Sequence, residues 1–350
     1  MALAELPRGS KVLLRLPNWL GDVILCTPAL AALKAARPDL RLHALVKPGV
    51  HSAVEGLPGL DSVLTLGATD FWGTLAQASA LRREGFAAAL VFPKGFREAA
   101  LAFLARIPFR AGLRTDRRSL LLTHPVAFTE RDWHQHHARQ FAKVLEPLGI
   151  ALWDEGLSFP LSSRDHEEAE RVLREAGIAA PFAVFHIAAS KAPRAWHPER
   201  FGTVAKEVEA RLGLRPVLVG APADLPVHEA FRGACPSAVD LAGKTTLRGM
   251  AAVLARADLF VGNDSGPMHV AAAVGTKVVA VFGPGAPEKT APYLPPDRFR
   301  VVYGGLPCSP CRQAFWTECG PFPSGKPPCL EGIPARAVVH ACLELFGKRG

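Results

Sequence analysis

The sequence predicts an α/β protein made of two doubly wound units, each built on a parallel sheet. Apolar runs of strand length alternate with longer segments of helical periodicity in both halves of the chain. Strands that are separated by helices favour parallel pairing, because a parallel connection needs a long crossover. A length of 350 residues also exceeds what one ordinary core holds, so two domains are expected.

The first half of the chain, residues 1–160, is expected to form the first domain. Its strands are predicted at residues 11–16, 40–46, 62–66, 88–92 and 110–113. Its helices are predicted at residues 23–36, 74–84 and 97–105.

The second half, residues 161–333, repeats the same alternation. Its strands are predicted at residues 182–187, 216–219, 238–240, 259–261 and 278–282. Its helices are predicted at residues 198–212, 224–233, 247–256 and 267–274.

The join between the domains is expected near residues 151–180, where residues 166–176 carry apolar side chains at helical spacing. A last helix is expected within residues 334–350, and it packs either on the second domain or back on the first. Two such domains that face one another place a cleft at the carboxyl ends of their strands, where ligands bind in this topology.

Composition excludes several classes of protein. No run approaches the roughly 20 uninterrupted apolar residues of a membrane span. The N-terminal apolar segment resembles a signal peptide but is interrupted by polar residues and a proline, so we expect a cytoplasmic protein. Seven cysteines in this length do not suggest a disulfide scaffold. The net charge of +9 suits a phosphorylated ligand or an anionic membrane face, whereas the lack of a long Lys/Arg run argues against nucleic acid.

The segment Gly262–His269 is a small polar turn between a predicted strand and a predicted helix. Backbone N–H groups at such a turn, together with the helix dipole, favour an anion such as a phosphate. The alternative for Asp264 or Ser265 is simply to cap the helix, and the alternative for His269 is packing.

A second candidate site is Pro17–Asp22, at the end of the first predicted strand. Asp22 either caps the following helix or directs a carboxylate into the cleft, where it could accept a proton. Gly21 lets the backbone approach a ligand closely.

A third candidate is the loop from His186 to Pro198, which also joins a strand to a helix. Ser190 and neighbouring N–H groups could receive phosphate, with Lys191 or Arg194 supplying charge; the alternative is a solvated basic loop. Gly220 and the loop containing Lys244 and Thr245 extend this rim. The glycine pattern of a dinucleotide fold and the Walker A loop are both absent from the sequence, which argues against dehydrogenases and P-loop kinases.

Four cysteines lie within 22 residues near the C-terminus and suit a structural metal ion, although their spacing after the first pair is irregular. They are Cys308, Cys311, Cys319 and Cys329. In a reducing compartment this cluster indicates a structural zinc or, with a poorer fit, an iron–sulfur cluster. The alternative is a set of free or oxidised thiols, and nothing places the cluster in a reaction.

Four segments of the chain resemble the heptosyltransferases of lipopolysaccharide core assembly, glycosyltransferase family 9. They are PNWLGDVILCTPALAALK, WHPERF, DLAGKTTLRGMAAVLARADLFVGNDSGPMHVAAAVGTKVVAVFGP and CSPC. The resemblance runs in order through most of the chain and is dense from about residue 240 to 312. It implies a GT-B fold of two Rossmann-like domains, an ADP-activated heptose donor, inversion at the anomeric carbon, and no cofactor or metal in catalysis.

The resemblance also assigns roles to individual residues. It makes Asp22 the general base, and it matches Asp264, Ser265, Gly266 and His269 to the turn that holds the donor. The family usually has Pro-Gly-Ala-Ser followed by Lys-Arg-Trp-Pro in the second loop. Here residues 187–190 read Ile-Ala-Ala-Ser and residues 193–196 read Pro-Arg-Ala-Trp. The cation that meets the diphosphate is therefore displaced, and both Lys191 and Arg194 stay open for this role.

The acceptor implied by the resemblance is an acidic, lipid-linked saccharide at the inner face of the cytoplasmic membrane. Seven basic residues of the first half suit such an acceptor, the alternative being ordinary solvated charge: Lys94, Arg97, Arg106, Arg110, Arg114, Arg117 and Arg118. The expected acceptor contacts are Asn18, Trp19, Lys94, Arg97 and Arg118.

The sequence thus favours an inverting transferase that moves a heptose from ADP-heptose to a lipid-linked core saccharide. One alternative is a family member that uses another nucleotide sugar for a different surface glycan. Another is a nucleotide-sugar-binding protein in which Asp22 is idle.

Overall fold

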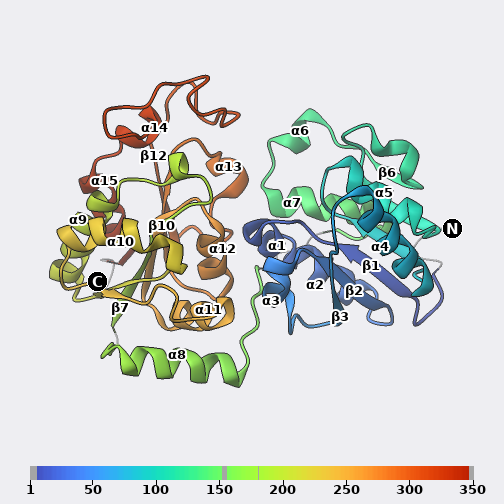
Figure 1. The fold of residues 1–350 in the computed structure, drawn as a ribbon, viewed down its shortest axis with the longest axis horizontal. Helices are drawn as coiled ribbons and strands as arrows, with labels where there is room; N and C mark the ends of the chain where they lie inside the picture. Colours follow the sequence, from blue (N-terminus) through green and yellow to red (C-terminus); the bar gives the residue numbers. More distant parts are fainter. Residues whose placement is uncertain (1–5, 152–155, 180, 347–350) are drawn as a thin grey trace. The chain divides into compact units, whose positions relative to one another are not determined.

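The computed structural model describes residues 6–151, 156–179 and 181–346. The chain divides into two compact units, Met1–Pro160 and Leu161–Gly350, and each unit carries its own six-stranded sheet (Figure 1). Within the described part of the chain, no helix combines the length and the apolar character needed to cross a bilayer.

The sheet of the first unit has the strand order β3-β2-β1-β4-β5-β6, with every pair parallel. Its strands are β1 Lys11–Arg15, β2 Arg41–Val46, β3 Leu60–Thr65, β4 Ala88–Val91, β5 Phe109–Leu113 and β6 His124–Val126. The order reverses beside the central strand β1, because β2 lies on one side of it and β4 on the other. Such a switch point opens a crevice at the carboxyl ends of the strands.

The helices of the first unit form two groups. The α-helices are α1 Leu20–Leu25, α2 Thr27–Ala36, α3 His51–Val54, α4 Phe71–Arg83, α5 Phe96–Leu104, α6 Glu130–Trp133 and α7 His137–Ala142, and the 3₁₀ helices are η2 Pro48–Val50, η3 Arg118–Leu121 and η4 Lys143–Leu148. Helices α4 and α5 pack together on one core cluster, and α7 contacts both α1 and α2.

The single helix predicted at residues 23–36 is two helices, α1 and α2, which meet at Cys26. Pro28 explains the break. It has no N–H to donate to the carbonyl of Ile24, and its ring crowds that carbonyl. The Thr27 hydroxyl donates to the Ile24 oxygen instead, at 2.7 Å. This break leaves α1 as a short helix directly after β1, and it carries Asp22.

The sheet of the second unit has the order β12-β11-β10-β7-β8-β9 and is also parallel throughout. Its strands are β7 Phe182–His186, β8 Arg215–Leu218, β9 Val239–Asp240, β10 Leu259–Asn263, β11 Val278–Phe282 and β12 Phe299–Tyr303. The edge strands β6 and β12 were not predicted. β6 is short and contains Pro125, and β12 is only half-buried, so neither gives a clear apolar run.

The helices of the second unit pack on both sides of its sheet. The α-helices are α8 Ser163–Glu175, α9 Pro198–Leu212, α10 Leu225–Ala234, α11 Leu247–Arg256, α12 Gly266–Ala273, α13 Pro287–Thr290, α14 Pro328–Glu331 and α15 Ala335–Phe346, and the 3₁₀ helices are η5 Ala192–Arg194 and η6 Pro222–Asp224. The sequence left open which domain receives the last helix. α15 packs against α9 and β12, and its buried residues Val338, Cys342 and Leu345 join the core of the second unit.

Helix α8 is joined to α11 by a buried ion pair. Ser162 and Asp165 form a capping box at the start of α8, and Arg248 of α11 donates to the Asp165 carboxylate at 2.6 Å. Burial raises the pKa of Asp165, but the hydrogen bonds from Arg248 and Ser162 outweigh it and lower that pKa to about 2. The folded state therefore favours the ionised carboxylate.

We expect this pair to make the second unit acid-sensitive. A depressed folded-state pKa gives stability that is complete above the ordinary value of 3.8 and is lost as the pH falls toward about 2. Asp165→Asn should remove about 1–2 kcal/mol at pH 7 and flatten the dependence in that window. Urea unfolding at a series of pH values measures both effects. An unchanged slope of stability against pH below 4 would contradict the assignment.

Candidate active site

Asp22 lies in the first turn of α1, at the switch point beside the carboxyl end of β1. Trp19 occupies the N-cap position, and its side chain makes no capping hydrogen bond. Asp22 does not cap the helix either. Its Oδ1 lies 3.4 Å from Nδ1 of His137, the first residue of α7. The His137 side chain is 28% exposed and that of Asp22 is 30% exposed, so this carboxylate is held by a partner and still open to a substrate.

Sequence reasoning missed His137, because no helix was predicted around it. The sequence signal was the cluster of His134, His136 and His137. The three residues separate in the structure: His136 accepts a hydrogen bond from the Ala138 N–H at the start of α7, whereas His137 turns to Asp22.

Arg15 at the end of β1 anchors the loop that leads to Asp22. Its side chain is only 3% exposed, its Nη2 donates to Asn18 Oδ1 at 2.5 Å, and its Nη1 donates to the Leu16 carbonyl. Burial lowers the pKa of Arg15 to about 10. The side-chain oxygen of Asn18, a predicted acceptor contact, therefore accepts a hydrogen bond within this loop. Trp19 is 65% exposed, and the ring of Trp19 lies 5.7 Å from the Lys47 ammonium.

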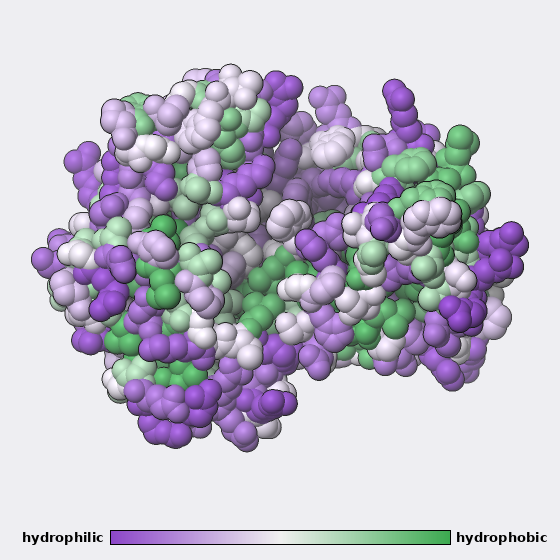
Figure 2. Space-filling view, viewed as in Figure 1, coloured by the Kyte–Doolittle hydropathy of each residue, from purple (hydrophilic) through white to green (hydrophobic). Residues whose placement is uncertain are grey.

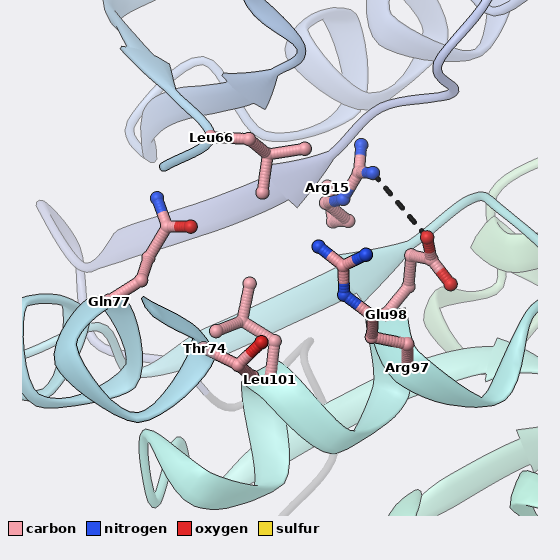
Figure 3. Close-up of a pocket in the computed structure, with 7 residues that line it drawn as sticks. All are labelled: Arg15, Leu66, Thr74, Gln77, Arg97, Glu98 and Leu101. Carbon is pink, nitrogen blue, oxygen red and sulfur yellow. Dashed lines mark ion pairs between the residues drawn. The ribbon is translucent and has the colours of Figure 1, made fainter. Parts of the chain in front are cut away.

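A small cavity of about 10 Å³, with room for one water, lies beside Arg15. Figure 3 shows Arg15 and Glu98 directed toward one another across it, and their ion pair measures 3.6 Å. Arg97, from the first turn of α5, points into the same space (Figure 3). The cavity is lined by Arg15, Leu66, Thr74, Gln77, Arg97, Glu98 and Leu101. Of the predicted acceptor residues, Arg97 thus combines exposure with a place at the carboxyl edge of the sheet.

Arg118 was predicted to contact the acceptor, and the structure corrects this. The residue is fully buried. Its guanidinium donates to three backbone carbonyls, those of Leu113 at 2.9 Å, Gly95 at 3.1 Å and Pro93. Burial lowers the pKa of Arg118 to about 10. Arg118 therefore holds the loop between β4 and α5 in place and is not available to a ligand.

Lys94 is half-buried in the same loop. Its ammonium donates to Gln140 Oε1 at 2.6 Å and lies 4.3 Å from the ring centroid of Trp133 and 4.8 Å from that of Phe128. These contacts hold Lys94 against α6 and α7, so its ammonium interacts with side chains of the same unit.

The polar turn at the end of β10 is tied to the third candidate loop by two residues. Asn263 is fully buried; its amide donates to the Ile187 carbonyl at 2.8 Å and accepts from the Trp196 N–H at 2.9 Å. Arg194 donates to the Asp264 carboxylate at 2.7 Å and to the Asp264 carbonyl at 3.0 Å. Two segments that lie 70 residues apart in sequence thus form one site.

The capping alternative does not hold for Ser265. Ser265 occupies the N-cap position of α12, but its side chain makes no capping hydrogen bond. The Asp264 carboxylate turns to Arg194 and to the Thr290 hydroxyl, which lies 3.4 Å away. Ser265 Oγ lies 3.4 Å from Nδ1 of His186, whose pKa burial lowers to about 4. In the first turn of α12, Pro267 has no N–H and the Met268 N–H donates to the Ser265 carbonyl at 3.1 Å.

Close backbone approach at this turn requires glycine. A Cβ on Gly262 would collide with the His186 carbonyl, and one on Gly285 would collide with the Asp264 carboxylate. Gly266 begins α12. His269 is 4% exposed and lies in the same helix, so it packs within the unit.

The remaining predicted donor residues lie along the same edge of the sheet without joining the Asp264 turn. Ser190, Lys191 and Lys244 are exposed, and Thr245 is half-buried. The Lys191 ammonium lies 6.0 Å from the ring centroid of Phe315. Gly220 faces the Asp224 side chain, which a Cβ would meet.

The predicted zinc site does not form as a ligand set. Cys308 is exposed, Cys311 and Cys319 are half-buried, and Cys329 is buried. Burial and the neighbouring thiol of Cys311 raise the pKa of Cys329 to about 11. Among the described residues, no three His, Cys, Asp or Glu side chains are placed to hold a metal ion. Cys308 and Cys311 instead line an open pocket of about 510 Å³ beside Gly285.

Comparison with known proteins identifies the family. The model of glycosyltransferase family 9 (heptosyltransferase) matches residues 74–318. Lipooligosaccharide heptosyltransferase 2 of Haemophilus influenzae is 28% identical over 79% of this chain and 84% of its own length. Lipopolysaccharide heptosyltransferase 2 of Escherichia coli K12 is 26% identical over 81% of this chain and 85% of its own length.

Solved structures confirm the predicted GT-B fold. The structure of E. coli ADP-heptose lps heptosyltransferase II matches with a TM-score of 0.77 and 20% identity, covering 97% of this chain and 99% of that one. E. coli heptosyltransferase WaaC with ADP-2-deoxy-2-fluoro heptose matches with a TM-score of 0.65 and 21% identity, covering 83% and 92%. The two six-stranded parallel sheets account for this likeness.

Proposed function

Because this chain belongs to glycosyltransferase family 9, we propose that it transfers a heptose from ADP-heptose to a lipid-linked core saccharide, with inversion. Relatives are named lipopolysaccharide and lipooligosaccharide heptosyltransferase 2, and a structure of similar fold is described with an ADP-heptose analogue. The observation that carries the proposal is Asp22, a carboxylate at the switch point that its own helix does not use as a cap.

In the proposed reaction an acceptor hydroxyl attacks the anomeric carbon of the heptose. Asp22 takes the hydroxyl proton as the new C–O bond forms. The bond from the anomeric carbon to the diphosphate breaks on the opposite face, and ADP leaves with the electron pair. His137 holds one carboxylate oxygen of Asp22 and leaves the other for the acceptor.

Negative charge grows on the leaving diphosphate, and the turn after β10 is suited to stabilise it. The Gly266 N–H and the positive end of the α12 dipole lie at this turn, whereas Pro267 has no N–H and the Met268 N–H donates to the Ser265 carbonyl. Donors that are already in place when the charge develops lower the barrier of such a reaction. The proposal needs no metal ion, because these donors and a nearby cation supply the charge.

Arg194 is the cation that we assign to the diphosphate, in preference to Lys191. Asp264 orients its guanidinium at the turn, whereas the Lys191 ammonium lies near the Phe315 ring. Arg194→Met is expected to raise KM for ADP-heptose about 10- to 100-fold, the range of one or two charge-assisted hydrogen bonds. Lys191→Met is the matched control, with KM changed by less than about threefold. A larger effect in Lys191→Met than in Arg194→Met would reverse the assignment.

Calorimetry with ADP against UDP, followed by an ADP-release assay with ADP-heptose, tests the donor. We expect ADP to bind more tightly and ADP release to depend on both substrates. Tighter binding of UDP would overturn the heptose proposal and favour another nucleotide sugar.

We further propose an acidic glycolipid acceptor and peripheral association with the inner face of the cytoplasmic membrane. The names of the relatives support the acceptor class. Arg97 and Trp19, exposed at the carboxyl edge of the first sheet, are the side chains proposed to meet it.

A further inference from the structure

Helix α5 exposes large apolar side chains on its solvent face, beside the exposed Arg97. Its inner residues Leu101 and Ala102 are buried in the core that α4 and α5 share. On the outer face, Phe96 is 49% exposed, Phe103 45% and Leu104 41%. A surface helix normally carries polar residues on this side. The run from 99 to 105, Ala-Ala-Leu-Ala-Phe-Leu-Ala, holds no polar residue at all.

The 3₁₀ helix η3 extends this apolar face. It packs against α5 and carries Leu120, whose side chain is 93% exposed. Arg110 joins the two segments, because its guanidinium lies 5.4 Å from the ring centroid of Phe103 and its Nε donates to the Leu121 carbonyl at 2.7 Å. We call Phe96, Phe103, Leu104 and Leu120 the α5 surface. Figure 2 shows apolar side chains gathered over this part of the first unit, with hydrophilic ones beside them.

The charge around the α5 surface is predominantly positive. Residues 94–120 hold seven Lys and Arg against two acidic residues. Both acidic side chains are engaged within the unit, since Glu98 pairs with Arg15 and Asp116 accepts the Phe96 N–H. The arginines that remain exposed around the surface are Arg97, Arg106, Arg114 and Arg117.

We propose that the α5 surface docks on an anionic lipid bilayer, with its apolar side chains at the boundary of headgroups and acyl chains. Apolar area and cationic side chains on one helix face are the two features that hold interfacial helices on anionic membranes. Exposed apolar side chains in a cationic surround fit an anionic apolar partner better than a neutral or cationic one. The α5 surface would thus be the site of the membrane association proposed above, and vesicle binding tests it independently of the transfer reaction.

Sedimentation of the purified chain with lipid vesicles tests the proposal. We expect binding to vesicles of phosphatidylethanolamine and phosphatidylglycerol, weaker binding at high salt, and little binding to phosphatidylcholine alone. The triple variant Phe103→Ser, Leu104→Ser, Leu120→Ser should bind at least about tenfold more weakly. Arg106→Gln with Arg117→Gln should weaken binding and reduce its salt dependence. Leu225→Ser, a 46% exposed apolar position on α10, is the matched control and should bind as the wild type does.

Three outcomes would overturn the proposal. The first is a folded triple variant that binds vesicles as tightly as the wild type, and the second is a wild type that binds phosphatidylcholine vesicles as tightly as anionic ones. The third is a wild-type dimer that the triple variant no longer forms, because the α5 surface would then be a contact between two copies of the chain. Transfer to a short soluble acceptor should be unchanged in the triple variant, because no residue of the proposed machinery is altered. A wild type that binds vesicles and transfers no heptose would refute the proposed function alone.

Discussion

Asp22→Asn is expected to lower kcat for heptosyl transfer by about 10²- to 10⁴-fold, the contribution of a positioned general base. Asparagine keeps the size of the side chain and a polar contact for His137, but it cannot take the acceptor proton. Steady-state ADP release at saturating donor and acceptor measures the loss. Binding of ADP-heptose by calorimetry should stay near wild type, since the donor turn lies in the other unit.

Glu130→Gln is the matched control for this variant, because Glu130 is an exposed carboxylate in the first turn of another helix, α6. Its kcat should stay within about twofold of wild type. His137→Asn should lower kcat less than Asp22→Asn does, because the base itself remains. Transfer by Asp22→Asn near the wild-type rate would show that Asp22 is not the base.

Trp196→Ala is expected to destabilise the second unit by about 3–5 kcal/mol, the usual effect of truncating a buried tryptophan. The side chain is fully buried. Its ring packs edge-on against Phe201 at 4.7 Å between centroids, and its indole N–H donates to the Ile333 carbonyl at 3.2 Å. Its removal leaves a cavity, while the Ile333 carbonyl keeps its hydrogen bond from Arg200 at 2.8 Å. Urea unfolding of the full chain, followed by circular dichroism, measures the change.

The same substitution should also weaken donor binding, because the buried Trp196 ring anchors the segment that carries Arg194 and whose backbone N–H bonds to Asn263. Trp196→Phe keeps most of the packing and should lose about half as much stability. Trp316→Ala, at a 45% exposed position, should change it by less than about 1 kcal/mol. A loss below about 1 kcal/mol in Trp196→Ala would contradict the packing argument.

Much of the fold follows from local pattern. Buried strands such as β7, β10 and β11 are short apolar runs, with a polar residue only at the end of β7 and β10, so the alternation of parallel strands and helices was predictable. The edge strands β6 and β12 and the break at Pro28 were missed, because a short half-buried strand and a single proline give weak signals within an otherwise regular pattern.

The candidate site divides in the same way. The positions of the Asp22 and Asp264 turns could be predicted from the sequence, because each turn follows the end of an apolar strand. Their partners depend on the folded chain: His137 contacts Asp22 from 115 residues away and Arg194 contacts Asp264 from 70 residues away. The structural role of Arg118 depends on the folded chain as well. Hydrogen bonds between segments depend on how strands are ordered in the sheet, and no local pattern of residues encodes that order.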